Sequence, residues 1–77
     1  MIKLYKKVAL TKNVPEKGLR RGDVGAVVMI HDDGGYEVEF MTFSGDTIAV
    51  VTLEPHDVRP VGADEIANAR AVASASP

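Results

Sequence analysis

Residues 36–40 carry the clearest hydrophobic pattern in the chain, because apolar or aromatic side chains alternate there with two glutamates in the order Tyr-Glu-Val-Glu-Phe. A period of two predicts a strand with one buried side and one solvent-facing side. The mainly apolar run 24–31 precedes it. Between the two runs, residues 32–35 (Asp-Asp-Gly-Gly) supply the positive-φ positions of a tight connection. The sequence therefore predicts a β-hairpin over residues 24–40.

Three further β-prone runs flank this hairpin, at residues 6–10, 47–53 and 58–61. Gly25 predicts a bulge or a close approach of another backbone near the start of its strand. Pro60 in the last run would be tolerated at a sheet edge. Five short strands separated by turn residues, with no helical pattern before residue 62, predict an all-β fold: a small five-stranded barrel.

The C-terminal part of the chain changes character after residue 61. Residues 63–75 are rich in alanine, with acidic side chains early and Arg70 late, an order that suits a helix dipole. Ile66 begins only a thin apolar face, and so short a helix is marginal alone in water. We expect a barrel domain over residues 1–61 and an Ala-rich tail over 62–77, as a short docked helix or a disordered segment.

Size and composition restrict the classes of protein to consider. The 77 residues correspond to one domain, near the size where a single core is only just sufficient. Cysteine is absent, so disulfides and thiolate metal sites cannot add stability. The first residues lack a secretory leader pattern, and no run is long enough to span a membrane. We expect a cytoplasmic protein that does not bind membranes.

The charges are divided along the chain. Residues 1–21 contain seven Lys or Arg and one acidic residue, whereas residues 22–57 contain eight acidic residues and no Lys or Arg. The basic part could be a footprint for nucleic acid or an acidic partner. Alternatively, the basic first strand could lie beside acidic strands and pair with them across the sheet.

Candidate chemistry is sparse. His31 and His56 are the only histidines, and neither belongs to a metal-binding pair, so we expect both to be exposed turn side chains. No phosphate-binding loop or serine-nucleophile motif is present. Glu37 and Glu39 share a strand face, but alternating glutamates are typical of any half-buried strand. We expect no enzyme activity, no cofactor and no metal.

Several segments together resemble a known family. Residues 8–10, 18–28, 36–40 and 57–61 are similar in sequence and spacing to the small bacterial domain-of-unknown-function family 4926, over about residues 2–61. The resemblance implies an SH3-like barrel, gives no catalytic residues and leaves the tail outside the family. An accessory or antitoxin-like role would suit such a standalone small protein. The segment 19–28 is also similar to the strand-turn-strand of KOW-type barrels, which bind RNA or protein.

Two functions of different class follow from these patterns. The first is a non-catalytic module that binds another protein or a second copy of itself, as a homodimer, through a face containing Tyr5, Tyr36, Glu37, Glu39 and Phe43. The alternative is a KOW-like barrel that binds nucleic acid through the basic N-terminal third. The side chains that would contact phosphates are Lys6, Lys7, Lys12, Lys17, Arg20 and Arg21.

Overall fold

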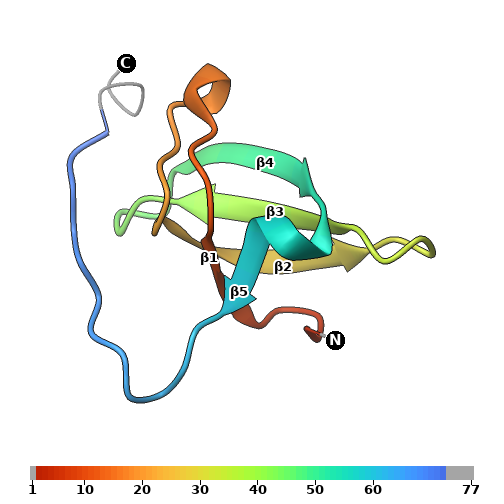
Figure 1. Cartoon of the computed structure of the whole chain (residues 1–77). Coiled ribbons are helices and arrows are strands. Elements are labelled where there is room, and N and C mark those ends of the chain that lie inside the picture. The colour runs from red at the N-terminus through yellow and green to blue at the C-terminus, as the bar shows by residue number, and fades with distance from the viewer. Residues whose placement is uncertain (1, 73–77) are drawn as a thin grey trace.

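A computed structural model describes residues 2–72 as one five-stranded antiparallel sheet with two short 3₁₀ turns (Figure 1). Each predicted strand is present within one residue at either end. The strands are β1 (Lys7–Leu10), β2 (Val24–Ile30), β3 (Tyr36–Met41), β4 (Thr47–Leu53) and β5 (Val58–Pro60), and the 3₁₀ turns are η1 (Pro15–Lys17) and η2 (Pro55–Asp57).

The strand order in the sheet is β4-β3-β2-β1-β5, so the chain returns after β4 to pair β5 with β1. This order, with a 3₁₀ turn directly before the last strand, is consistent with the SH3-like arrangement. The described strands form one sheet that does not close on itself, because β4 and β5 are its two edge strands and do not pair with each other. β5 has only three residues and ends at Pro60, which has no N–H to extend a ladder. Pro60 therefore lies on an edge strand, as predicted.

Gly25 lies where two strands approach closely. A Cβ at this position would be 2.7 Å from Val38 Cγ1 and 2.8 Å from the Glu39 carbonyl oxygen, so only glycine fits. This close approach confirms one of the two predicted reasons for Gly25. The bulge lies farther along β2, where the register with β3 shifts between Val27 and Met29.

Two glycine turns connect β2 to β3 and β3 to β4, where turn residues separate the predicted strands. Gly34 and Gly45 both adopt φ of 95°, a region that L side chains rarely enter. In the first turn, Asp33 Oδ1 also accepts a hydrogen bond from the Gly35 N–H over 3.0 Å. The sharp β2–β3 and β3–β4 connections set which residues face the core.

One hydrophobic core lies on the inner side of the sheet. Val8, Leu10, Val27 and Val38 are its most completely buried side chains. The loop between β1 and β2 also contributes to the core through the buried side chains of Val14 and Leu19, which flank the turn η1. We name residues 11–23 the β1–β2 loop. No helix within residues 2–72 is long and apolar enough to cross a membrane.

The C-terminal segment, residues 61–72, contains no helix and no strand. It leaves β5 and returns along the molecule toward the β1–β2 loop (Figure 1). Of the two predicted forms of the tail, the helix is therefore wrong over 63–72, and residues 73–77 lie outside the described residues. The physical reason is the thin apolar face, because Ile66 is the single large apolar side chain before Val72 and a short helix would have little to bury.

Candidate functional site

The predicted protein-binding face is divided between the two sides of the sheet. Glu37 and Glu39 lie on the outer side, but Tyr36 is only 4% exposed and belongs to the core, so its prediction as a surface residue is wrong. Residues one apart in a strand point to opposite sides, which separates Tyr36 from Glu37. Tyr5 is exposed in the chain before β1, where its N–H donates to the Val27 carbonyl oxygen of β2, and Phe43 is exposed in the β3–β4 turn.

Apolar side chains surround the two glutamates on the outer side of the sheet. Met29 is the cross-strand partner of Glu37, and Val50 is the partner of Glu39. Met41 follows Glu39 by two residues on the same side of β3. The three apolar side chains are about half exposed, at 53%, 50% and 51% for Met29, Val50 and Met41. We name this surface the outer face; it consists of Met29, Glu37, Glu39, Met41 and Val50.

Polar neighbours hold the two glutamates of the outer face in place. Glu37 Oε2 accepts hydrogen bonds from Thr52 Oγ1 and from His31 Nε2, the latter over 2.6 Å, and these bonds lower the pKa of Glu37. The same contact with Glu37 raises the pKa of His31. Glu39 accepts a hydrogen bond from Thr47 Oγ1 over 2.7 Å. The glutamates are therefore oriented side chains.

The two histidines differ from each other. His56 has an 82% exposed side chain, which confirms its prediction as an exposed turn residue. His31 is partly shielded, with a 38% exposed side chain, because β3 places Glu37 within reach of its ring. Within residues 2–72, no three His, Cys, Asp or Glu side chains lie close enough together to hold a metal ion.

The basic first strand, β1, does not lie beside the acidic strand β3 in the sheet. β1 has β2 and β5 as neighbours, and β2 separates β1 from β3, so the predicted pairing of the basic first strand with acidic strands is wrong. Lys6 and Lys7 instead line a groove together with Lys3, Tyr36 and residues around β5. The remaining predicted basic residues lie in the β1–β2 loop, where Lys12 Nζ is 3.4 Å from Asp57 Oδ1; they are Lys12, Lys17, Arg20 and Arg21.

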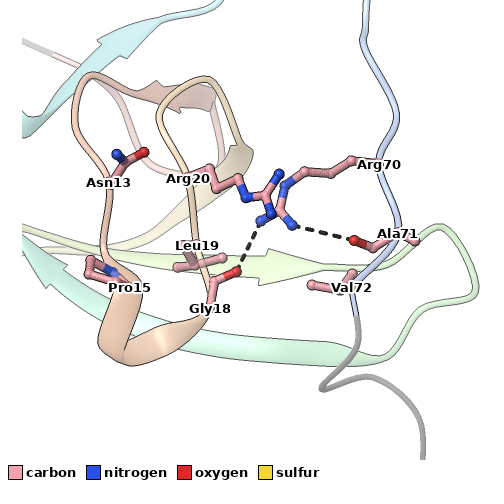
Figure 2. A pocket seen from close by; sticks show the side chains of 8 residues that line it. All are labelled: Asn13, Pro15, Gly18, Leu19, Arg20, Arg70, Ala71 and Val72. Carbon is pink, nitrogen blue, oxygen red and sulfur yellow. Dashed lines mark hydrogen bonds between the residues drawn. The ribbon is translucent and has the colours of Figure 1, made fainter.

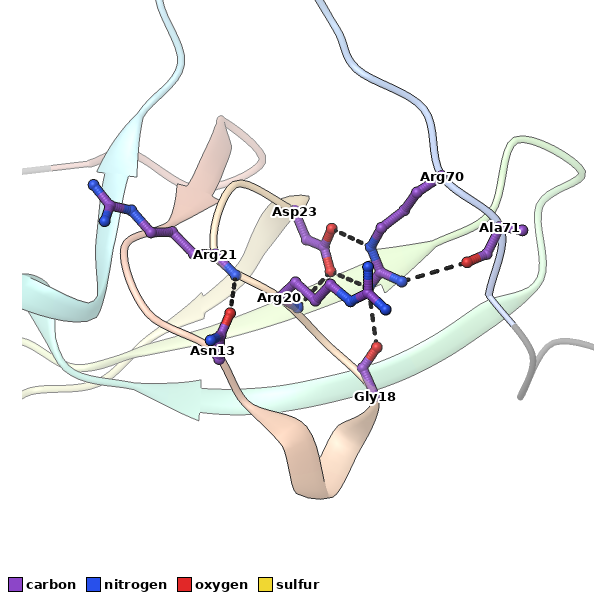
Figure 3. A network of polar contacts seen from close by, with 7 residues as sticks. All are labelled: Asn13, Gly18, Arg20, Arg21, Asp23, Arg70 and Ala71. Carbon is purple, nitrogen blue, oxygen red and sulfur yellow. Dashed lines mark hydrogen bonds and ion pairs between the residues drawn. The ribbon is translucent and has the colours of Figure 1, made fainter.

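A polar network connects the β1–β2 loop with the C-terminal segment (Figure 3). Arg70 forms a two-bonded ion pair with Asp23, and the Arg20 N–H donates to Asp23 Oδ2 over 2.7 Å. Burial of Asp23 would raise its pKa, but the bonds from Arg70 and Arg20 outweigh burial and keep the pKa below its ordinary value. The sequence prediction missed this contact because it placed Arg70 in a helix. The one feature of the sequence that could have indicated the contact is that Arg70 is the single arginine of the tail.

The comparisons with known proteins concern the sheet and not the C-terminal segment. Residues 4–60 match the family described as Domain of unknown function (DUF4926). No curated protein and no solved structure matches the chain significantly. The match covers about three quarters of the chain and includes all five strands, so the chain belongs to this family.

Proposed function

We propose that the protein is a non-catalytic module that binds another protein, or a second copy of itself, through the outer face. One observation carries this proposal: Met29, Met41 and Val50 are about half exposed around two oriented glutamates, and no described element covers them. An apolar patch rimmed by charge is the usual composition of an interaction surface.

The outer face combines two kinds of contact. The thioether side chains of Met29 and Met41 are flexible and polarisable, so they adapt to a partner surface. The carboxylates of Glu37 and Glu39 are held by neighbouring side chains, which reduces the ordering that binding would require. The acidic charge favours a partner whose rim contains Lys or Arg.

The test compares two exposed positions by size-exclusion chromatography with light scattering and by pull-down from the native host. Val50→Lys introduces a charge into the outer face, and Ile66→Lys introduces the same charge at an exposed position in the C-terminal segment. We expect a dimer or a specific partner with the wild type and Ile66→Lys, and its loss with Val50→Lys. A monomeric wild type whose bound proteins are unchanged by Val50→Lys would contradict the proposal.

A second candidate function is nucleic-acid binding, and one observation favours it. Lys3, Lys6 and Lys7 line a single groove, and none of the described residues that line it is Asp or Glu. Fluorescence anisotropy with single- and double-stranded oligonucleotides tests this function, and binding should weaken as the salt concentration rises. The double variant Lys6→Glu/Lys7→Glu should abolish binding, whereas Lys17→Glu in the β1–β2 loop should have a small effect. No binding by the wild type at low salt would exclude this candidate.

A further inference from the structure

The β1–β2 loop presents three hydrogen-bond acceptors to one guanidinium group (Figure 3). Arg70 Nε donates to Asp23 Oδ1 over 2.8 Å, and Arg70 Nη2 donates to Asp23 Oδ2 and, over 3.0 Å, to the Gly18 carbonyl oxygen. The Asp23 and Arg70 side chains are 18% and 26% exposed, so the contact is largely shielded from water. Paired bonds of this kind match a planar guanidinium, whereas a lysine ammonium is a point donor. The acceptors therefore suit arginine.

The acceptors are held in place by the loop itself. Asp23 Oδ2 also accepts from the Arg20 N–H, and Gly18, at φ 70°, donates its N–H to the Pro15 carbonyl oxygen over 3.0 Å. Val14 and Leu19 pair within the loop and are both buried in the core. A site on so firmly anchored a loop needs little ordering when a ligand binds.

The segment that supplies Arg70 has few other attachments to the molecule. Residues 62–69 are all exposed. Glu65 accepts two hydrogen bonds from Arg59, over 2.9 and 2.8 Å, and these bonds hold the start of the segment next to β5. Arg70, Ala71 and Val72 then line a groove with residues of the loop, among them Pro15 and Leu19 (Figure 2). The contact with the loop thus depends on an arginine and the two residues after it, in extended chain.

We propose that the β1–β2 loop is a binding site for an extended segment of another protein that contains an arginine followed by small apolar residues, and that Arg70 occupies this site in cis. This site is separate from the outer face. The short tether 61–69 keeps Arg70 at a high local concentration, on the order of millimolar. A partner segment must displace Arg70. Its apparent affinity for the protein is therefore the affinity of the empty site multiplied by the fraction of molecules in which Arg70 is detached.

The test uses the full chain and a labelled peptide with the sequence of residues 66–72, blocked at both ends, as the probe. Arg70→Ala empties the site, and we expect it to bind the probe about fivefold more tightly than the wild type does. Ile66→Ser changes an exposed position of the same segment and should bind the probe as the wild type does. A probe with lysine in place of its arginine should bind Arg70→Ala at least tenfold more weakly.

Three outcomes would overturn the proposal. The first is equal affinity of the wild type and Arg70→Ala for the probe, and the second is equal affinity of the arginine and lysine probes for Arg70→Ala. The third is a wild-type dimer that Arg70→Ala converts to a monomer in light scattering, because a second copy would then supply the arginine. The double variant Arg70→Ala/Asp23→Asn should lose the probe while keeping a folded circular dichroism spectrum. Retained binding by a folded double variant would also contradict the assignment of Asp23.

Discussion

The β1–β2 loop and the C-terminal segment both lack strands, but they are held to the sheet by different forces. The loop buries Val14 and Leu19 in the core and pairs them with each other. The segment exposes residues 62–69 and is attached through two arginine–carboxylate ion pairs. A segment without helix or strand can therefore either belong to the core of a small domain or be only loosely attached to it. The burial of its apolar side chains decides which of the two applies.

The difference has an energetic basis. Full burial of an aliphatic side chain contributes about 1.5–3 kcal/mol, whereas exposed ion pairs contribute about 0.2–1 kcal/mol because water and salt screen them. In a domain of 77 residues, the loss of one core side chain is a large fraction of total stability. The loop should thus unfold with the sheet, and the segment should detach without it.

The largest effect is expected for Leu19→Ala. Leu19 is buried in the core cluster, so its truncation leaves a cavity and should cost about 2–5 kcal/mol of unfolding free energy. The midpoint of urea unfolding measures this cost. An unchanged midpoint would show that the loop is no better anchored than the C-terminal segment.

Arg70→Ala should release the end of the C-terminal segment and leave the sheet intact. We expect a cost of about 1 kcal/mol, because Arg70 contributes one ion pair and no side chain to the hydrophobic core. Backbone NMR relaxation should show increased motion at Arg70, Ala71 and Val72, whereas amide hydrogen exchange should stay unchanged in β1 to β4. A loss of protection throughout the sheet would mean that the segment is part of the cooperative unit.

Acid should detach the C-terminal segment from β5 and from the β1–β2 loop. The hydrogen bonds from Arg59 and from the Gly62 N–H lower the pKa of Glu65 to about 2, and the pKa of Asp23 is also below its ordinary value. Both carboxylates are ionised and the segment is fully attached above the unfolded-state pKa values of about 4. The attachment is lost as the pH falls through the lowered folded-state pKa values of Glu65 and Asp23. Carboxyl chemical shifts measured by NMR check these lowered pKa values. Titration of Glu65 at its ordinary pKa in the folded protein would contradict the prediction.

The smallest effect is expected for Ile66→Ser. Ile66 is 95% exposed, so it has almost no buried apolar area to lose. We expect a change within about 0.5 kcal/mol in unfolding free energy, against the several kcal/mol expected for Leu19→Ala. A clear destabilisation would indicate that the segment packs against the sheet or against another molecule in solution.

Local patterns predicted the strands well and the surfaces only in part. The alternation in β3 correctly placed Val38 in the core and Glu37 outside, and the glycine turns followed from Gly34 and Gly45. The same alternation puts Tyr36 on the core side, although the predicted face combined it with Glu37. Exposed aromatic residues cannot be gathered into one face from sequence, because only the fold places Tyr5 next to β2 and Phe43 in the β3–β4 turn.

The sequence by itself determined the five strands, the turns and the division of charge, because these depend on neighbouring residues. Only the tertiary structure decided that β2 separates basic β1 from acidic β3, and that Arg70 meets Asp23. Both facts depend on contacts between residues far apart in the chain. The Ala-rich composition favoured a helix, but a helix without an apolar face gains nothing from docking. The ion pairs Arg59–Glu65 and Arg70–Asp23 instead attach the C-terminal segment to β5 and to the β1–β2 loop.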